Sequence, residues 1–313
     1  MKVVFLDSDS LPVSIARPAW VTDWQDRPDT TPDQVVDAAR DADAVITNKV
    51  RIGRAELEQL PNLRFICVAA TGYDCIDLAA CRDFAVTVCN VPAYSAQSVA
   101  ESVIASIFAL RRQLFVYQAA ALRDWPGSRH FCVHRAPIQD VQGSVLGIIG
   151  RGGIGLATAR LASALGMQLL FAEHRGVVPV RKGYQSFETV LAQSDVISLH
   201  CPLTEHTRHL IGAPELAQMK PGALLINTAR GPLVDETAVL DALDSGRLGG
   251  AALDVLCQEP PPADHPLLNS RHANLIVTPH VAWASQSSLQ RLADGILGNL
   301  QGYHSGNLIN LVS

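Results

Sequence analysis

His280, Glu259 and Arg230 have the side-chain chemistry needed to move a proton and hold a carboxylate. An imidazole titrates near neutrality, so His280 can exchange a proton with a substrate oxygen. A carboxylate such as Glu259 on the far ring nitrogen would favour the protonated ring and fix its tautomer. Arg230 can grip a substrate carboxylate through two parallel N–H bonds. Taken singly, each residue also fits an ordinary capping His, loop Glu or surface Arg. Whether they form a site therefore depends on the strands and helices that position them.

A glycine-rich turn lies between two apolar runs in the stretch VLGIIGRGGIGLATARLASALGMQLLFAEHR, positions 145–175. Gly150, Gly152 and Gly155 have G-x-G-x-x-G spacing, which allows a tight turn, close approach to a pyrophosphate, and close helix–strand packing. The anion would lie at the helix N-terminus, where unsatisfied N–H groups favour negative charge. Glu173 follows the second run and would accept hydrogen bonds from a ribose diol. Three glycines can also form a simple turn, but strand, helix and distant carboxylate together predict a dinucleotide site.

Apolar runs and helical patterns continue to alternate beyond Glu173, which is typical of a doubly wound parallel sheet of the Rossmann type. In such a sheet the ligand crevice lies outside the carboxyl ends of the strands. We therefore expect the polar residues that end these runs to converge on one site: Gly150, Glu173, His200-Cys201, Thr228-Ala229-Arg230, Asp254 and Thr278-Pro279-His280.

The first hundred residues show the same alternation, with apolar runs at 3–6, 44–47, 63–70 and 86–88 and helical patterns at 32–40 and 54–60. Thr71 and Gly72 follow one of these runs and could offer backbone N–H groups to a carboxylate, as a nest does. Ser98 and Glu101 have capping-box spacing, which predicts a helix from 98 to about 111. Residues 125–142 are expected to be an irregular, exposed segment.

The last helical pattern, 285–303, is expected to return to the first domain and make that domain discontinuous. The predicted boundaries are 1–98 with 286–313 for a smaller substrate domain, and 99–285 for the cofactor domain.

The composition excludes several classes of protein. With 313 residues, 48% hydrophobic and 18% charged, the chain can bury a large core, and its net charge of −5 gives no reason to expect a nucleic-acid or membrane partner. The N-terminal apolar run is too short for a signal peptide, so a cytoplasmic protein is expected. Seven cysteines without a C-x-x-C pair fit reduced thiols, and Cys132 with His130 and His134 lacks a fourth metal ligand nearby. No metal is predicted.

The chain resembles the D-2-hydroxyacid dehydrogenase family, and within it the glycerate dehydrogenase (hydroxypyruvate reductase) branch. The resemblance is carried by VLGIIGRGGIG, HCPLTEHT, MKPGALLINTARGPLVDETAVL, GGAALDVLCQEP and VTPHVAWAS, about half of the chain. It implies a Rossmann-type cofactor domain, a flavodoxin-like substrate domain built from both chain ends, and a homodimer that buries part of the cofactor domain's surface.

The resemblance also implies roles for single residues. His280 would be the acid/base, Glu259 its partner, and Arg230 the residue that binds and orients substrate. Substrate contacts would come from Thr71, Gly72, Arg230 and His280. Cofactor contacts would come from Gly150, Gly152, Gly153, Ile154, Gly155, Glu173, Cys201, Thr207, Thr228, Ala229, Arg230, Asp254, His280 and Ala282.

Two residues depart from the family pattern. Glu173 stands where Asp is usual, and His174 and Arg175 follow it. A carboxylate repels a 2′-phosphate, so NAD(H) is favoured over NADP(H), although Arg175 could bind that phosphate if Glu173 turned away. Gly153 replaces a larger side chain, which should leave backbone contacts intact.

The expected reaction is hydride transfer between nicotinamide and C2 of a small 2-hydroxy or 2-keto acid, with glycerate/hydroxypyruvate or glyoxylate preferred. Phosphoglycerate dehydrogenase is an alternative, disfavoured by the lack of an added regulatory domain. Formate dehydrogenases of this fold pair the His with Gln, so Glu259 argues against them. An NAD(H)-sensing corepressor resembling the C-terminal-binding proteins is the alternative from another class, disfavoured by the near-absence of polar extensions.

Overall fold

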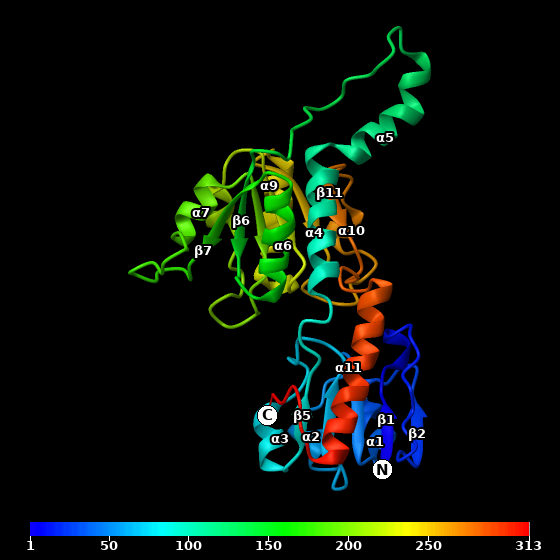
Figure 1. Cartoon of the computed structure of the whole chain (residues 1–313). Helices are drawn as coiled ribbons and strands as arrows, with labels where there is room; N and C mark the ends of the chain where they lie inside the picture. The colour runs from blue at the N-terminus through cyan, green and yellow to red at the C-terminus, as the bar shows by residue number, and fades with distance from the viewer. Residues whose placement is uncertain (313) are drawn as a thin grey trace. The chain divides into compact units, whose positions relative to one another are not determined.

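The computed structural model describes residues 1–312, which form two compact units. The split unit contains Met1–Ser95 and the carboxy-terminal segment from Ala284, and the central unit contains Ala96–Trp283. Both chain ends therefore belong to the split unit (Figure 1).

The split unit is built on a five-stranded parallel sheet in the order β2-β1-β3-β4-β5. This 2-1-3-4-5 order is the flavodoxin-like one. The carboxy-terminal helix α11 (Gln286–Ser305) buries Leu292, Ile296 and Leu300, and its Tyr303 ring stacks on Phe65 of β4 at 4.5 Å. The strands are β1 (Lys2–Phe5), β2 (Asp23–Asp26), β3 (Ala44–Thr47), β4 (Phe65–Val68) and β5 (Thr87–Cys89). The other α-helices are α1 (Val35–Ala39), α2 (Arg54–Leu57) and α3 (Leu78–Asp83).

The central unit is built on a six-stranded parallel sheet in the order β11-β10-β9-β8-β6-β7. Counted along the chain this order is 2-1-3-4-5-6, so the direction of winding reverses beside β6. The strands are β6 (Val145–Ile149), β7 (Gln168–Ala172), β8 (Val196–Leu199), β9 (Ala223–Asn227), β10 (Leu248–Leu253) and β11 (Leu275–Val277). The expected fold class, Rossmann-type α/β with a second flavodoxin-like sheet, is confirmed.

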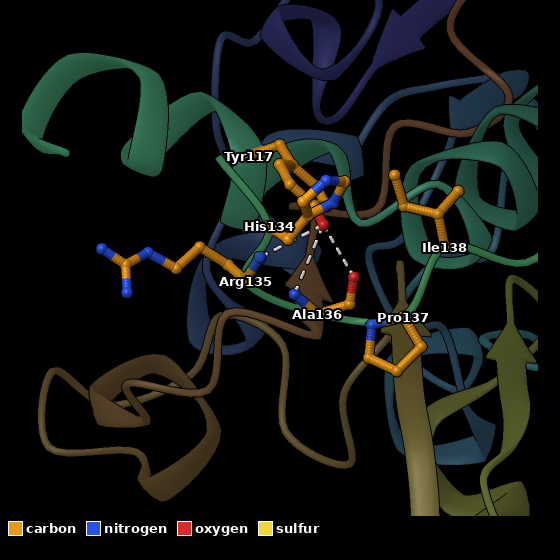
Figure 2. A pocket seen from close by; sticks show the side chains of 6 residues that line it. All are labelled: Tyr117, His134, Arg135, Ala136, Pro137 and Ile138. Atoms are coloured by element: carbon orange, nitrogen blue, oxygen red, sulfur yellow. Dashed lines mark hydrogen bonds between the residues drawn. The ribbon is translucent and has the colours of Figure 1, made fainter. Parts of the chain in front are cut away.

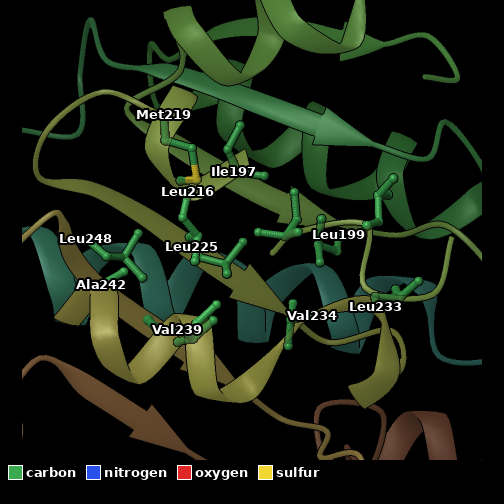
Figure 3. Close-up of a cluster of buried hydrophobic side chains, with 14 of the residues drawn as sticks. Ile197, Leu199, Leu216, Met219, Leu225, Leu233, Val234, Val239, Ala242 and Leu248 are labelled. Atoms are coloured by element: carbon green, nitrogen blue, oxygen red, sulfur yellow. The ribbon is translucent and has the colours of Figure 1, made fainter. Parts of the chain in front are cut away.

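Both faces of the central sheet are covered, because neighbouring strand residues point to opposite sides. Leu225 of β9 packs with α7 (Phe187–Gln193), α8 (Ala213–Gln218) and α9 (Glu236–Asp244), the cluster drawn in Figure 3. Ile226 packs on the other face, with α4 (Ala96–Arg111) and α6 (Gly153–Ala164). Two-sided burial explains why these strands appear in the sequence as continuous apolar runs rather than alternating ones.

The capping box predicted at Ser98 is wrong. Helix α4 already begins at Ala96, so Ser98 lies inside the helix, where its hydroxyl donates to the carbonyl oxygen of Ala282 at 2.7 Å. Glu101 accepts instead from the Gln97 amide. The motif therefore predicts the region of the helix correctly but places the start of the helix at the wrong residue.

Helix α5 (Leu114–Arg123) follows α4 after a turn at Gln113, where φ is +55°. From Trp125 to Gln142 the chain has only one short 3-10 turn, Trp125–Gly127, in agreement with the expected irregular segment. Helix α5 and the strand-free segment after it extend away from the rest of the central unit (Figure 1). We call residues 113–138 the arm.

Within residues 1–312, no helix is both long and apolar enough to cross a membrane. The same residues contain no group of three or more His, Cys, Asp or Glu side chains arranged to hold a metal ion.

Candidate active site

Three neighbouring strands of the central sheet place the three candidate reactive residues. Strands β9, β10 and β11 are adjacent and parallel, and they are followed by Arg230, Glu259 and His280 respectively. Because the carboxyl ends of parallel strands lie at one edge of the sheet, the three residues arise from one edge.

Glu259 connects the loop after β10 to His280. Its Oε2 lies 2.8 Å from Nδ1 of His280, and its Oε1 accepts the backbone N–H of Leu256 at 3.0 Å. Each carboxylate oxygen thus has an acceptor role of its own. Because the carboxylate accepts, Nδ1 carries the proton, and Nε2 is the ring nitrogen that faces away from Glu259. The side chain of His280 remains 24% exposed, so the ring is not sealed within the protein.

The loop that carries His280 is held by Asp254, which is only 4% exposed. The Asp254 carboxylate accepts from the hydroxyl of Thr278 at 2.5 Å and from the backbone N–H groups of Val281 and Ala282 at 2.9 Å. His280 itself has φ of +54°, a left-handed conformation that is unfavourable for a residue with a Cβ. Asp254 therefore holds His280 in a backbone conformation that residues with a Cβ adopt only rarely.

Arg230 follows a similarly braced turn. Asn227, fully buried at the end of β9, donates to the carbonyl oxygen of Arg230 at 2.8 Å and accepts the N–H of Ala229 at 3.1 Å. A Cβ added to Gly231 would lie 2.0 Å from the carbonyl carbon of Leu256. The loops after β9 and β10 are thus in direct backbone contact, which fixes the turn bearing Arg230 against the one bearing Glu259.

The glycine-rich turn fits a dinucleotide. Gly150 has φ of +105°, and a Cβ there would lie 2.5 Å from the backbone of His200. A Cβ at Gly155 would lie 2.1 Å from the carbonyl oxygen of Gly150. At Gly152 and Gly153, by contrast, none of the described atoms lies within 4 Å of such a Cβ. The space over the N-terminus of α6 is open, as a pyrophosphate bound to backbone N–H groups requires.

The other predicted cofactor contacts lie after the strands around the reversal point. Cys201 is partly buried after β8, and burial raises the pKa of its thiol to about 11, so the thiol is neutral. Thr207 is engaged within its own loop, where its hydroxyl accepts from Thr204 N–H at 2.7 Å and donates to Pro202 at 2.8 Å. The Oγ1 of Thr228 is buried and has no hydrogen-bond partner among residues 1–312. Such an orphaned hydroxyl fits a residue that contacts a ligand.

Glu173 and Arg175 differ from the expected arrangement. Glu173 follows β7 and is 2% exposed, and hydrogen bonds from Arg181 hold the pKa of its carboxyl at about 2. Arg175 forms an ion pair with Glu215 at 2.6 Å and donates to the Leu210 carbonyl. The Arg175 side chain that could have taken a 2′-phosphate is therefore engaged with other partners.

Thr71 and Gly72 belong to the split unit, where they follow β4. The Thr71 carbonyl accepts from the side chain of Asn90 at 2.7 Å, and its hydroxyl donates to Val91 at 3.2 Å. Their contact with a substrate carboxylate stays a prediction, as do the roles of the residues of the central unit.

Sequence reasoning missed the residues that brace the site: Asn227, Gly231 and Arg181. Asn227 had a readable signal, because it is a polar residue that completes the fully buried strand ALLIN. Gly231 depends on a contact between two loops, and Arg181 depends on the chain folding back within the loop after β7, so neither has a local signature.

Comparison with known proteins identifies the family. The family model for the D-isomer specific 2-hydroxyacid dehydrogenase NAD binding domain matches residues 104–282. The chain belongs to this family. The resemblance and the NAD(H) prediction made from the sequence are thus confirmed, and residues 104–282 are the family's NAD-binding part.

Relatives that match nearly the whole chain support the same family. A putative 2-hydroxyacid dehydrogenase of Haemophilus influenzae is 46% identical over 312 residues, covering 97% of this chain and 98% of that protein. The glycerate dehydrogenase of Methylorubrum extorquens is 44% identical over 313 residues, covering 99% and 98%. Among solved structures, a protein from Thermus thermophilus matches with a TM-score of 0.87 and 30% identity, covering 100% of both chains.

Proposed function

We propose that the protein is an NAD-dependent dehydrogenase for a small D-2-hydroxy acid, with D-glycerate and hydroxypyruvate as the preferred pair and glyoxylate next. The observation that carries the chemistry is the hydrogen bond between Glu259 and His280, which leaves one ring nitrogen for the substrate. The substrate choice is supported by the 44% identity to a glycerate dehydrogenase.

In the direction of reduction, the hydride to C2 would come from the nicotinamide of a dinucleotide held by the glycine-rich turn. His280, as the imidazolium, donates a proton from Nε2 to the developing alkoxide oxygen. Glu259 holds the ring in orientation and stabilises its positive charge before transfer. Arg230 binds the substrate carboxylate with both arms of its guanidinium, which fixes the carbon that reacts. In the opposite direction the neutral imidazole takes the hydroxyl proton.

The direct test follows the absorbance of NADH with hydroxypyruvate, glyoxylate and a 3-phosphorylated hydroxypyruvate as substrates. We expect turnover at about 1 to 10³ per second, the ordinary range for enzymes, with hydroxypyruvate preferred. The His280→Ala variant should lose turnover by about 10² to 10⁴-fold while binding NADH nearly as well, because it lacks only the proton donor. Preference for the phosphorylated acid would indicate a phosphoglycerate dehydrogenase. Tight binding of NADH without turnover would indicate a cofactor sensor.

We also propose a cytoplasmic homodimer that forms through the arm. All seven cysteines are free, in keeping with a reducing compartment. The arm exposes Phe131, Leu122 and Trp125 at 90%, 76% and 53% of their surface. Apolar side chains gathered on one extended segment are typical of a surface that a partner covers.

The arm also forms an open hollow of about 550 Å³, lined by Tyr117, His134, Arg135, Ala136, Pro137 and Ile138. Figure 2 shows the Tyr117 hydroxyl hydrogen-bonded to the backbone of Arg135 and Ala136, which fixes the returning segment. Light scattering should give a dimer mass for the wild-type chain and a monomer mass for Phe131→Glu. Val178→Glu is the matched control, because Val178 is equally exposed, at 88%, but lies outside the arm. A wild-type monomer would contradict the dimer.

A further inference from the structure

The carboxylate of Glu173 is fully engaged by the protein's own donors. Arg181 binds it with two nitrogens, Nε to Oε2 at 2.5 Å and Nη2 to Oε1 at 2.6 Å. The backbone N–H groups of His174 and Arg181 add bonds of 2.8 and 3.2 Å. A carboxylate has about four acceptor sites, so these four donors occupy them all. A ribose diol could bind Glu173 only by displacing the guanidinium.

The Arg181 side chain can release the Glu173 carboxylate and bind it again, because Arg181 lies on the exposed loop between β7 and α7. Its side chain is 54% exposed, whereas that of Glu173 is 1% exposed. The Arg181 guanidinium also lies 4.3 Å from the ring centre of Tyr184, and this cation–π contact is available to it when it does not bind Glu173. Glu173 is fixed and Arg181 is the movable member of the pair.

A second arginine adds positive charge beside this pair. Arg151, within the glycine-rich turn, lies over the rings of Phe171 and Tyr184, at 4.5 and 5.2 Å from their centres. Tyr184 is thus in contact with the guanidinium groups of Arg151 and Arg181. These two cations and the single carboxylate of Glu173 leave an excess of one positive charge next to the predicted ribose site.

We propose that Arg181 determines the choice between NAD(H) and NADP(H) by covering Glu173. With Arg181 on Glu173, the diol of NAD(H) must compete for its acceptor, and the 2′-phosphate of NADP(H) meets a guanidinium instead of a bare carboxylate. The wild-type chain therefore binds NADP(H) as a weaker second cofactor beside NAD(H), and loss of Arg181 restricts it to NAD(H). This inference rests on the proposed role of Glu173 as the ribose acceptor.

The charges of Glu173 and Arg181 do not change near neutrality. Hydrogen bonds from Arg181 lower the pKa of the carboxyl from 4.5 to about 2. Glu173 is therefore ionised in any assay near neutrality, and Arg181 is always charged. At a fixed pH of about 8, where the 2′-phosphate of NADP(H) has also lost its second proton (pKa about 6), the ratio of the two cofactor affinities then reports the position of Arg181.

The test is to measure dissociation constants for NADH and for NADPH, by cofactor fluorescence, in the wild type and in Arg181→Ala. Loss of Arg181 should tighten NADH several-fold, because the diol no longer competes, and weaken NADPH by about tenfold or more, the effect of one charge-assisted contact. Lys182→Ala is the matched control, since it removes a neighbouring exposed cation of the same loop, and it should change neither constant more than about twofold.

Two further variants make the result decisive. Arg181→Lys keeps the charge without the two-pronged geometry and should fall between wild type and Arg181→Ala. In the double variant Glu173→Gln/Arg181→Ala, the discrimination against NADPH should vanish, because no carboxylate remains to repel the phosphate. An NADH-to-NADPH ratio that is the same in wild type, Arg181→Ala and Arg181→Lys would overturn the proposal, and so would weaker NADH binding in Arg181→Ala. Because binding is measured without substrate, failure of the proposed reaction would appear separately, as NADH binding without turnover of hydroxypyruvate.

Discussion

Asp254 and His280 are joined through the main chain: the carbonyl oxygen of Asp254 accepts the N–H of His280 at 2.8 Å. The Asp254 carboxylate then binds the next two N–H groups, those of Val281 and Ala282. A buried acid that follows β10 thus sets the backbone of the proposed proton donor, which follows the neighbouring strand β11.

Asp254→Asn should destabilise the protein and lower kcat. The amide presents one acceptor fewer to three donors, and an unsatisfied buried donor costs about 1–3 kcal/mol. We expect a loss of about 2–4 kcal/mol in urea unfolding, together with at least tenfold slower turnover. Asp244→Asn is the control, because its pair with His272 is a surface one worth about 0–1 kcal/mol. Equal stability of the two variants would refute the positioning role.

Glu259→Gln should slow reduction. The amide of Gln can keep a hydrogen bond to Nδ1 of His280, but it has no charge to stabilise the imidazolium that donates the proton. Charge-assisted hydrogen bonds are roughly twice as strong as neutral ones, so we expect kcat with hydroxypyruvate to fall about tenfold, while the dissociation constant for NADH stays nearly the same. A variant with the wild-type kcat would show that the charge of Glu259 has no part in proton delivery.

Gly231→Ala should disturb the loops that carry Arg230 and Glu259. The added Cβ would lie 2.0 Å from the backbone of Leu256, a contact that forces the two loops apart. Overpacking of this kind typically costs about 1–3 kcal/mol, and we expect kcat to fall with it. Gly127→Ala is the control, since no described atom lies within 4 Å of its Cβ. The measurements are the melting temperature and the kcat of both variants. If Gly231→Ala has the same melting temperature and kcat as Gly127→Ala, the contact between the two loops is contradicted.

The pair formed by Glu173 and Arg181 should contribute to stability only above acid pH. The pKa of the Glu173 carboxyl falls from 4.5 to about 2 in the folded protein. Its contribution is therefore fully present above pH 4.5 and is lost as the pH falls toward 2. The free energy of unfolding of wild type and Arg181→Ala should differ most at pH 7, differ less at pH 3, and converge only near pH 2. A difference that is constant over this range would count against the ion pair.

The sequence predicted the central sheet well, because its strands are buried on both faces and end abruptly in polar residues. Strand β2 escaped prediction since its four residues, Asp23–Asp26, are mostly polar and are held by pairing with β1 at the sheet edge. Contacts made by a loop folding back on itself could not be predicted from the sequence either. Proximity in sequence pointed to Arg175 beside Glu173, whereas the chain folds back and brings Arg181 instead.

The placement of α11 has a consequence for biosynthesis. The sheet at the beginning of the chain is completed by a helix from its end, so the ribosome must make all of Ala96–Trp283 before that sheet can close. At ordinary translation speeds this delay is roughly 10 to 40 s, during which the face of β4 that α11 covers stays open to water or to a chaperone. Protease digestion of stalled nascent chains should accordingly find the central segment resistant before the amino-terminal one.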